Sequence, residues 1–164
     1  MRTVALLAAL LLPAALSAAD WGPLEFLVGH WTGEGGGDPG AGSGAFTLTP
    51  DLQGKILVRK NFATYPAAAG RPAFRHDDLM IVYRDEELSG LRATYWDNEG
   101  HVIAYRVQPA AEGGVTFLSD GPPAGMRYRL TYLPAGKDKI KIRFEIAPPG
   151  KDFSTYLEAA AHKD

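Results

Sequence analysis

The sequence predicts an all-β fold, a single up-and-down antiparallel β-barrel of about ten strands with a short N-terminal helix that plugs one end. Short runs of alternating apolar and polar residues follow one another along most of the chain, separated by turns rich in its 19 glycines and 12 prolines. The turns are short, and short turns join neighbouring antiparallel strands. The 164 residues also suffice for one domain with a substantial core.

The first 19 residues are expected to lie outside this domain. Arg2 provides a positive charge, the apolar run from Val4 to Leu12 follows, and small residues end at Ala19. This three-part pattern is typical of a secretory signal peptide, and the apolar run is shorter than the roughly 20 residues that span a bilayer. We therefore expect a signal peptide at 1–19, a barrel domain at 20–164 and a periplasmic or secreted product.

Composition excludes several classes of chemistry. The chain has no cysteine, so disulfides, thiolate catalysis and thiolate metal sites are ruled out. Its formal net charge is −2, which gives it no electrostatic attraction for nucleic acid or anionic lipid. Beyond the signal peptide, no apolar run reaches membrane length, so we expect no membrane insertion of the mature chain.

A short helix is expected at 23–29, because Pro23 suits a first helical position and Leu24, Leu27 and Trp31 recur on one face. Alternation and turn residues then predict ten strands. Their expected ranges are 30–36, 43–50, 55–65, 77–84, 88–97, 101–108, 114–119, 126–134, 138–147 and 152–161.

Alternation also predicts which side chains face inward. In 138–147 charged residues alternate with isoleucine and phenylalanine, and 126–134 behaves alike, so each strand has one wet and one dry face. The segment 79–83 is apolar on both faces, so we expect its outer face to be covered by the N-terminal helix or by a partner chain, as in a homodimer. The residues expected to line the interior are Tyr128, Leu130, Tyr132, Ile140, Ile142 and Phe144.

The segment from Leu24 to Gly37 resembles the opening of calycin-type, lipocalin-like barrels, in which a short helix precedes Gly-x-Trp in the first strand. Here that motif is Gly29-His30-Trp31, and its extension Gly-x-Trp-x-Gly-x-Gly resembles nitrobindin-like and fatty-acid-binding-protein-like barrels. The segments 76–80 and 95–103 are similar to a family of uncharacterised, often secreted bacterial barrels, a domain of unknown function. The resemblance implies that Gly29 and Trp31 are structural, with Trp31 closing the floor of the barrel.

Nitrobindin-like proteins bind haem through a histidine on a late strand, so the resemblance makes haem one candidate cofactor. The segment Phe153–Leu157 has no histidine, and His162 is expected in the C-terminal tail. This chain therefore departs from the haem-binding pattern at the position where the ligand is expected.

A meander places alternate connections at opposite ends of the barrel, and the longest, most Gly- and Pro-rich ones gather at a predicted mouth. His76, Asp77, Asp97 and His101 are expected there, with the two histidines on strands about 9.6 Å apart. They could converge on a metal ion, a haem or an anion. In the simpler interpretation, 97–100 is a turn with side-chain-to-backbone bonds and the histidines are rim residues bonded to carboxylates.

These observations lead to three functional hypotheses. The first is an exported protein that binds a small hydrophobic or amphipathic molecule at His76, Asp97, His101, Tyr128, Tyr132 and Phe144. The second is haem or metal binding through His76 and His101. The third is a hydrolase-like enzyme, for which the sequence supplies no Gly-x-Ser-x-Gly elbow or other nucleophile motif. The sequence leaves open whether Arg59 and Arg92 point inward or outward.

Overall fold

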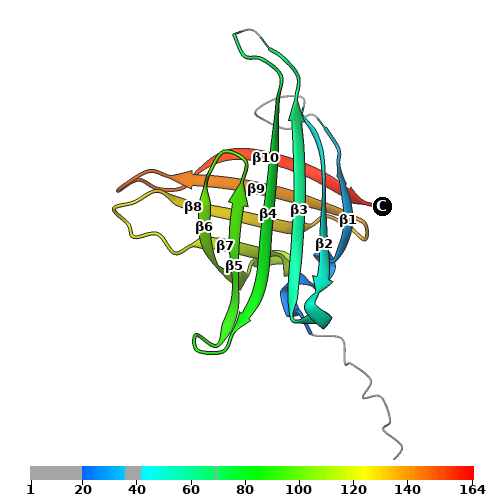
Figure 1. The fold of residues 1–164 in the computed structure, drawn as a ribbon, viewed down its shortest axis with the longest axis vertical. Coiled ribbons are helices and arrows are strands. Elements are labelled where there is room, and N and C mark those ends of the chain that lie inside the picture. The colour runs from blue at the N-terminus through cyan, green and yellow to red at the C-terminus, as the bar shows by residue number, and fades with distance from the viewer. Residues whose placement is uncertain (1–19, 36–41, 69) are drawn as a thin grey trace, which may run out of the picture.

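The structure, a computed structural model, describes residues 20–35, 42–68 and 70–164 and forms the barrel shown in Figure 1. The predicted signal peptide at 1–19 lies outside the described residues. The helical turns are η1 (Gly22–Leu27), η2 (Leu52–Gly54) and η3 (Ala111–Gly113). The strands are β1 (Gly29–Gly33), β2 (Ser43–Asp51), β3 (Ile56–Tyr65), β4 (Phe74–Asp85), β5 (Gly90–Asp97), β6 (Val102–Pro109), β7 (Val115–Ser119), β8 (Arg127–Pro134), β9 (Lys139–Ala147) and β10 (Ser154–Lys163).

The sheet is a closed antiparallel barrel in which every strand pairs with its neighbours in sequence, and β1 pairs with β10. The predicted fold class, including the number of strands and the up-and-down order, is therefore confirmed. Because each strand reverses direction, alternate connections lie at opposite ends of the barrel. The barrel is closed by β1, which pairs with the C-terminal end of β10 through Trp31, Thr32 and Gly33. None of the helices among the described residues is long and apolar enough to cross a membrane.

The N-terminal helix is shorter than predicted. It is a 3₁₀-helix of six residues with Pro23 in its first turn, and Val28 is already extended. At Gly29 the backbone has φ +136° and enters β1, so Trp31 belongs to a strand and not to the helix. A side chain at Gly29 would also collide with Lys163, because a Cβ there would lie 2.7 Å from the lysine Cε.

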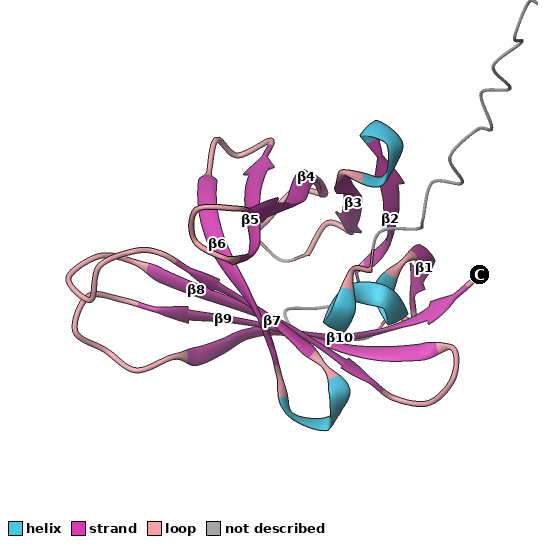
Figure 2. Ribbon diagram, turned by 90° about the horizontal axis from the view of Figure 1, so that it is seen from below, coloured by secondary structure: helices cyan, strands magenta, loops and turns pink. Residues whose placement is uncertain are grey.

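Helix η1 and Trp31 are part of the core. Leu24 and Leu27 are buried, and the Trp31 indole Nε1 donates a hydrogen bond to the Leu27 carbonyl at 2.9 Å. The indole also stacks on Phe46, with the ring centroids 6.1 Å apart. Figure 2 shows the helix within the ring of strands when the barrel is viewed from below. That this helix closes one end as a plug stays a prediction.

The last strand lies two residues farther along the chain than predicted. β10 continues to Lys163, so the expectation that His162 lies in a tail is wrong. The reason is that β10 pairs on both sides, with β9 through His162 and with β1 through Lys163. His162 is exposed and alternates with the buried Ala161, so it points away from the interior.

Alternation within strands largely matches the predicted faces. On β4, Met80 and Val82 are buried, and the outward Ile81 is opposite Val58 of β3. The outer apolar residues of β4 thus lie beside those of adjacent strands, and a covering homodimer stays a prediction. One residue predicted on the solvent-exposed face is buried instead, because Glu145 on β9 is only 8% exposed. Both of its carboxylate oxygens accept hydrogen bonds from Arg129 on β8, at 2.6 and 2.7 Å.

Candidate binding cavity

The barrel encloses a cavity of about 510 Å³. Its walls are largely apolar and aromatic. At one end the lining reaches Gly35, Arg71 and Met126, which lie in the β1–β2, β3–β4 and β7–β8 connections. The cavity therefore extends to this end of the barrel. The apolar and aromatic side chains along its wall include Phe46, Ile103, Tyr128, Leu130, Ile142 and Phe144.

A buried ion pair lies on the wall formed by β3 and β4. The Arg59 guanidinium binds the Asp78 carboxylate, and their side chains are only 9% and 4% exposed. Asn61, which is opposite Asp78 in the β3–β4 register, donates from Nδ2 to its Oδ2 at 2.7 Å. Burial raises the pKa of Asp78, but Arg59, His76 and Asn61 together hold that pKa below its usual value. Asp78 is therefore a carboxylate at neutral pH.

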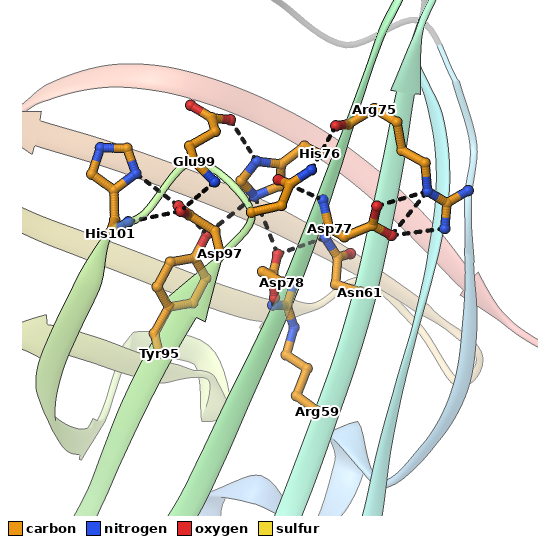
Figure 3. A network of polar contacts seen from close by, with 11 residues as sticks. Arg59, Asn61, Arg75, His76, Asp77, Asp78, Tyr95, Asp97, Glu99 and His101 are labelled. Carbon is orange, nitrogen blue, oxygen red and sulfur yellow. Dashed lines mark hydrogen bonds and ion pairs between the residues drawn. The ribbon is translucent and has the colours of Figure 1, made fainter.

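His76 links this pair to the rim of the barrel (Figure 3). Its Nδ1 lies 2.8 Å from Glu99 Oε1, and its Nε2 lies 3.1 Å from the Tyr95 hydroxyl and 3.4 Å from Asp78 Oδ2. The Asp78 carboxylate raises the pKa of His76 to about 9, assisted by Glu99 and opposed by burial. At neutral pH the imidazole therefore carries a proton on both nitrogens.

Asp97 organises the β5–β6 turn. Its Oδ1 accepts the backbone N–H groups of Glu99 and His101, at 3.0 and 2.9 Å, and its Oδ2 lies 2.8 Å from His101 Nδ1. The Tyr95 hydroxyl donates to the same Oδ2 at 3.2 Å. Burial raises the pKa of Asp97, but the hydrogen bonds from His101 and Glu99 outweigh it and lower that pKa. The turn chemistry expected at 97–100 is present, with Gly100 at φ +94°.

Figure 3 shows these groups as one network. The structure brings together three of the predicted mouth residues, since His76 and His101 are connected through Tyr95 and Asp97. Both ring nitrogens of His76 already contact oxygen atoms, and a protonated imidazole has no lone pair for a metal. Within the described part of the chain, no group of three or more His, Cys, Asp or Glu is arranged to hold a metal ion.

The other predicted site residues occupy different depths. Tyr128 and Phe144 line the cavity and stack on one another, with centroids 6.1 Å apart and rings 3° from parallel. Tyr132 is buried in the core, 1% exposed, and packs against Phe46 at 5.8 Å. Gly29 and Trp31 are not among the cavity-lining residues.

The sequence left open whether the side chains of Arg59 and Arg92 point inward or outward, and the structure shows their directions. Arg59 lines the cavity, whereas Arg92 binds Asp120 and is opposite Arg106 on the outer face. Asp77, expected at the mouth, binds Arg75 and does not line the cavity.

Four cavity-lining members of this polar network were not among the predicted site residues, namely Asn61, Asp78, Tyr95 and Glu99. The period of two along β4 carried the missing signal. If His76 faces inward, then Asp78 does too, and the β3–β4 register brings Asn61 opposite Asp78.

Fold and site together define a closed ten-stranded antiparallel barrel with an internal cavity and a charged network at one end. No family model matches the chain, and a search of curated proteins finds no match either. The resemblance to calycin-like barrels accordingly stays a prediction from the motifs.

Proposed function

We propose that this protein binds a small hydrophobic or amphipathic molecule inside its barrel. The observation that carries the proposal is the cavity of about 510 Å³, which lies in the size range of small-molecule sites. A barrel serving only as a stable scaffold gains by filling such a space, because unfilled apolar volume costs dispersion contacts.

The distribution of polarity supports an amphipathic ligand. Aromatic and aliphatic side chains such as Tyr128, Phe144 and Ile142 offer an apolar wall, whereas Arg59 and Asp78 supply polar atoms on another part of the lining. A molecule with an apolar body and one polar group satisfies both parts. The second hypothesis, haem or metal binding, gains no support, because both ring nitrogens of His76 contact oxygen atoms and, among the described residues, no group of three or more His, Cys, Asp or Glu is arranged to hold a metal ion.

The proposal is tested by titration with N-phenyl-1-naphthylamine, a neutral aromatic probe whose fluorescence rises in apolar surroundings. The expected result is saturable binding of one probe per chain. Unsaturable or absent fluorescence enhancement contradicts the proposal.

A pair of variants shows whether the probe enters the barrel. Ala159 lines the cavity on β10 and is opposite Ile142, another lining residue, so Ala159→Phe narrows the space. Ala104 is exposed on β6, opposite Thr94, and Ala104→Phe serves as the matched control. Probe affinity should fall at least about tenfold in the first variant and stay unchanged in the second, provided that both melt cooperatively.

Export is part of the same proposal, because the segment 1–19 has the pattern of a signal peptide. Expression of the full chain with its N-terminus should yield a processed protein outside the cytoplasm. N-terminal sequencing of that product should begin at about residue 20, and retention of Met1 contradicts this part of the proposal.

A further inference from the structure

His101 differs from His76 because one of its ring nitrogens has no partner. Its Nδ1 lies 2.8 Å from Asp97 Oδ2, and its backbone N–H donates to Oδ1 of the same carboxylate at 2.9 Å. Among the residues that the structure describes, no hydrogen bond or ion pair reaches Nε2. Figure 3 shows this nitrogen on the side of the ring away from Asp97. The His101 side chain is 53% exposed, so a ligand can reach it.

Asp97 determines the hydrogen-bonding role of this free nitrogen. Burial raises the pKa of Asp97, but the hydrogen bonds from His101 and Glu99 lower it overall, so the side chain is a carboxylate at neutral pH. A carboxylate only accepts hydrogen bonds, so the facing Nδ1 of His101 carries a proton. In a neutral imidazole the other nitrogen then has a lone pair, which makes Nε2 an acceptor.

His101 lies where the polar rim meets the apolar wall of the cavity. It directly precedes β6, and its carbonyl accepts a hydrogen bond from the Asp97 N–H at 3.3 Å, so it continues the pairing of β5 with β6. His101 and Ile103 both line the cavity, as expected for residues two apart on a strand. An acceptor at the rim with an apolar wall beside it fits a molecule that has a hydrogen-bond donor at one end.

The neighbouring charged groups at the rim are already engaged. Glu99 Oε1 lies 2.8 Å from His76 Nδ1, and the Arg71 guanidinium lies over the Phe74 ring, 4.9 Å from its centroid. A ligand carboxylate beside His101 would meet the carboxylates of Asp97 and Glu99 on the same turn, and like charges repel. A neutral donor avoids this repulsion.

We propose that the cavity, if it binds a small molecule as proposed above, selects ligands that carry a neutral hydroxyl group, which donates a hydrogen bond to Nε2 of His101. The apolar remainder of such an alcohol extends past Ile103 into the barrel. An ether or an ester has no proton to donate, so its oxygen would face the Nε2 lone pair without a bond.

The inference is tested by displacement of N-phenyl-1-naphthylamine at about pH 8, which favours the neutral imidazole, with 1-decanol, its isomer 1-methoxynonane, and decanoate. Burial of a hydroxyl without a partner is costly, so a cavity that lacks the acceptor prefers the ether. 1-Decanol should bind at least about threefold more tightly than either competitor. Equal or tighter binding of the ether or of decanoate overturns the inference while leaving the proposed function intact. Failure of the probe itself to bind overturns the proposed function and this inference with it.

His101→Phe removes the acceptor and keeps a planar ring at the rim. The readout is the preference for 1-decanol over 1-methoxynonane, a ratio of two Kd values in which the affinity of the probe cancels. This preference should disappear in His101→Phe. His30→Phe makes the same replacement at an exposed histidine that does not line the cavity, and it should retain the preference. A preference unchanged in His101→Phe means that another acceptor, such as Glu99, receives the hydroxyl, and it overturns the assignment.

Asp97→Asn tests Asp97 as the residue that positions the proton on His101. Oδ1 of Asp97 accepts two backbone N–H groups, so the amide oxygen should stay there and the amide N–H should face Nδ1 of His101. Nδ1 must then accept, and the ring proton moves to Nε2. The preference should shift toward 1-methoxynonane by at least about threefold, and the imidazole nitrogen chemical shifts measured by NMR should report the new tautomer. A proton on Nε2 together with an unchanged preference for the alcohol overturns the inference. Should this variant fail to fold, the competitor series and the His101→Phe and His30→Phe pair decide it.

Discussion

The stability of the barrel should fall as the pH rises from about 6.5 to 9, because of His76. In the folded protein the imidazole contacts Asp78 of its own strand, Tyr95 of β5 and Glu99 of the β5–β6 turn. Asp78, assisted by Glu99, raises its pKa from 6.5 to about 9. A group whose pKa is higher in the folded state contributes stability that is fully present below its unfolded value. That contribution is lost as the pH rises through the folded value.

The magnitude follows from the size of the shift. One pKa unit corresponds to about 1.4 kcal/mol, so the shift of His76 from 6.5 to about 9 corresponds to at most about 3–4 kcal/mol of unfolding free energy. The His76 side chain is 22% exposed and Glu99 is 54% exposed, so solvent screening reduces the contribution from Glu99. We expect a loss of about 1–3 kcal/mol between pH 6 and pH 9.5.

Urea unfolding monitored by tryptophan fluorescence at several pH values in this range measures the effect. His76→Gln keeps a hydrogen-bonding side chain but cannot take up the proton, so its unfolding free energy should vary much less with pH than that of the unaltered protein. His30 is exposed at the start of β1, and His30→Gln is the matched control that should retain the full pH dependence. If the His76→Gln variant keeps the slope, the imidazole is not the titrating group and the reasoning is refuted.

Two further predictions concern packing and ion pairing. In Gly44→Ala the new Cβ would lie 2.4 Å from a backbone oxygen of β3, so we expect the unfolding free energy in urea to fall by about 1–3 kcal/mol. In Gly90→Ala the atom nearest to the new Cβ is 3.8 Å away, so the unfolding free energy should change little. Glu145→Gln breaks the part-buried ion pair with Arg129, so it should lower the unfolding free energy by about 1–3 kcal/mol. Glu158→Gln breaks an exposed ion pair and should lower the unfolding free energy by less than about 1 kcal/mol. Equal effects within either pair of variants contradict the corresponding argument.

The fold could be predicted because its signal is local. A period of two is visible within each strand, and the turn residues between strands fix their number and, through the short connections, their order. The strand 126–134 illustrates this, since Tyr128, Leu130 and Tyr132 alternate with polar residues. Leu130 and Tyr132 are buried, whereas the polar residues between them are partly exposed. The predicted strand boundaries were less accurate where pairing with a distant strand determines them. Lys163 is an example, because it belongs to β10 through its pairing with Trp31 of β1, near the N-terminus.

The candidate site was only partly predictable because the inward face changes character along a strand. On β4 the inward residues run from Val82 and Met80, which are buried and apolar, to Asp78 and His76, which are polar. A rule that expects every inward residue to be apolar fails to predict the inward residues at the end of the strand where the cavity begins. The buried ion pair also depends on Arg59 of a neighbouring strand, and no local pattern specifies that partner.

Glu145 shows the same limit on the outer surface. Its place in the alternation of β9 predicts exposure, but Arg129 of β8 covers it with two hydrogen bonds, and the Arg129 guanidinium in turn lies 4.3 Å from the centroid of the Phe153 ring. Burial here results from side chains of another strand and of the segment before β10, so periodicity within β9 could not reveal it.

The hydroxyl of Tyr132 tests how a buried polar atom is satisfied in this core. It is 1% exposed, and no hydrogen bond of ordinary geometry reaches it among the described residues, although Arg59 lies near enough to oppose the rise that burial causes in its pKa. A buried hydroxyl without a partner costs about 1–3 kcal/mol of unfolding free energy. Tyr132→Phe should therefore leave the unfolding free energy unchanged or raise it, and urea unfolding measures the change. A loss of more than about 1 kcal/mol would mean that Arg59 uses this hydroxyl as a hydrogen-bond acceptor.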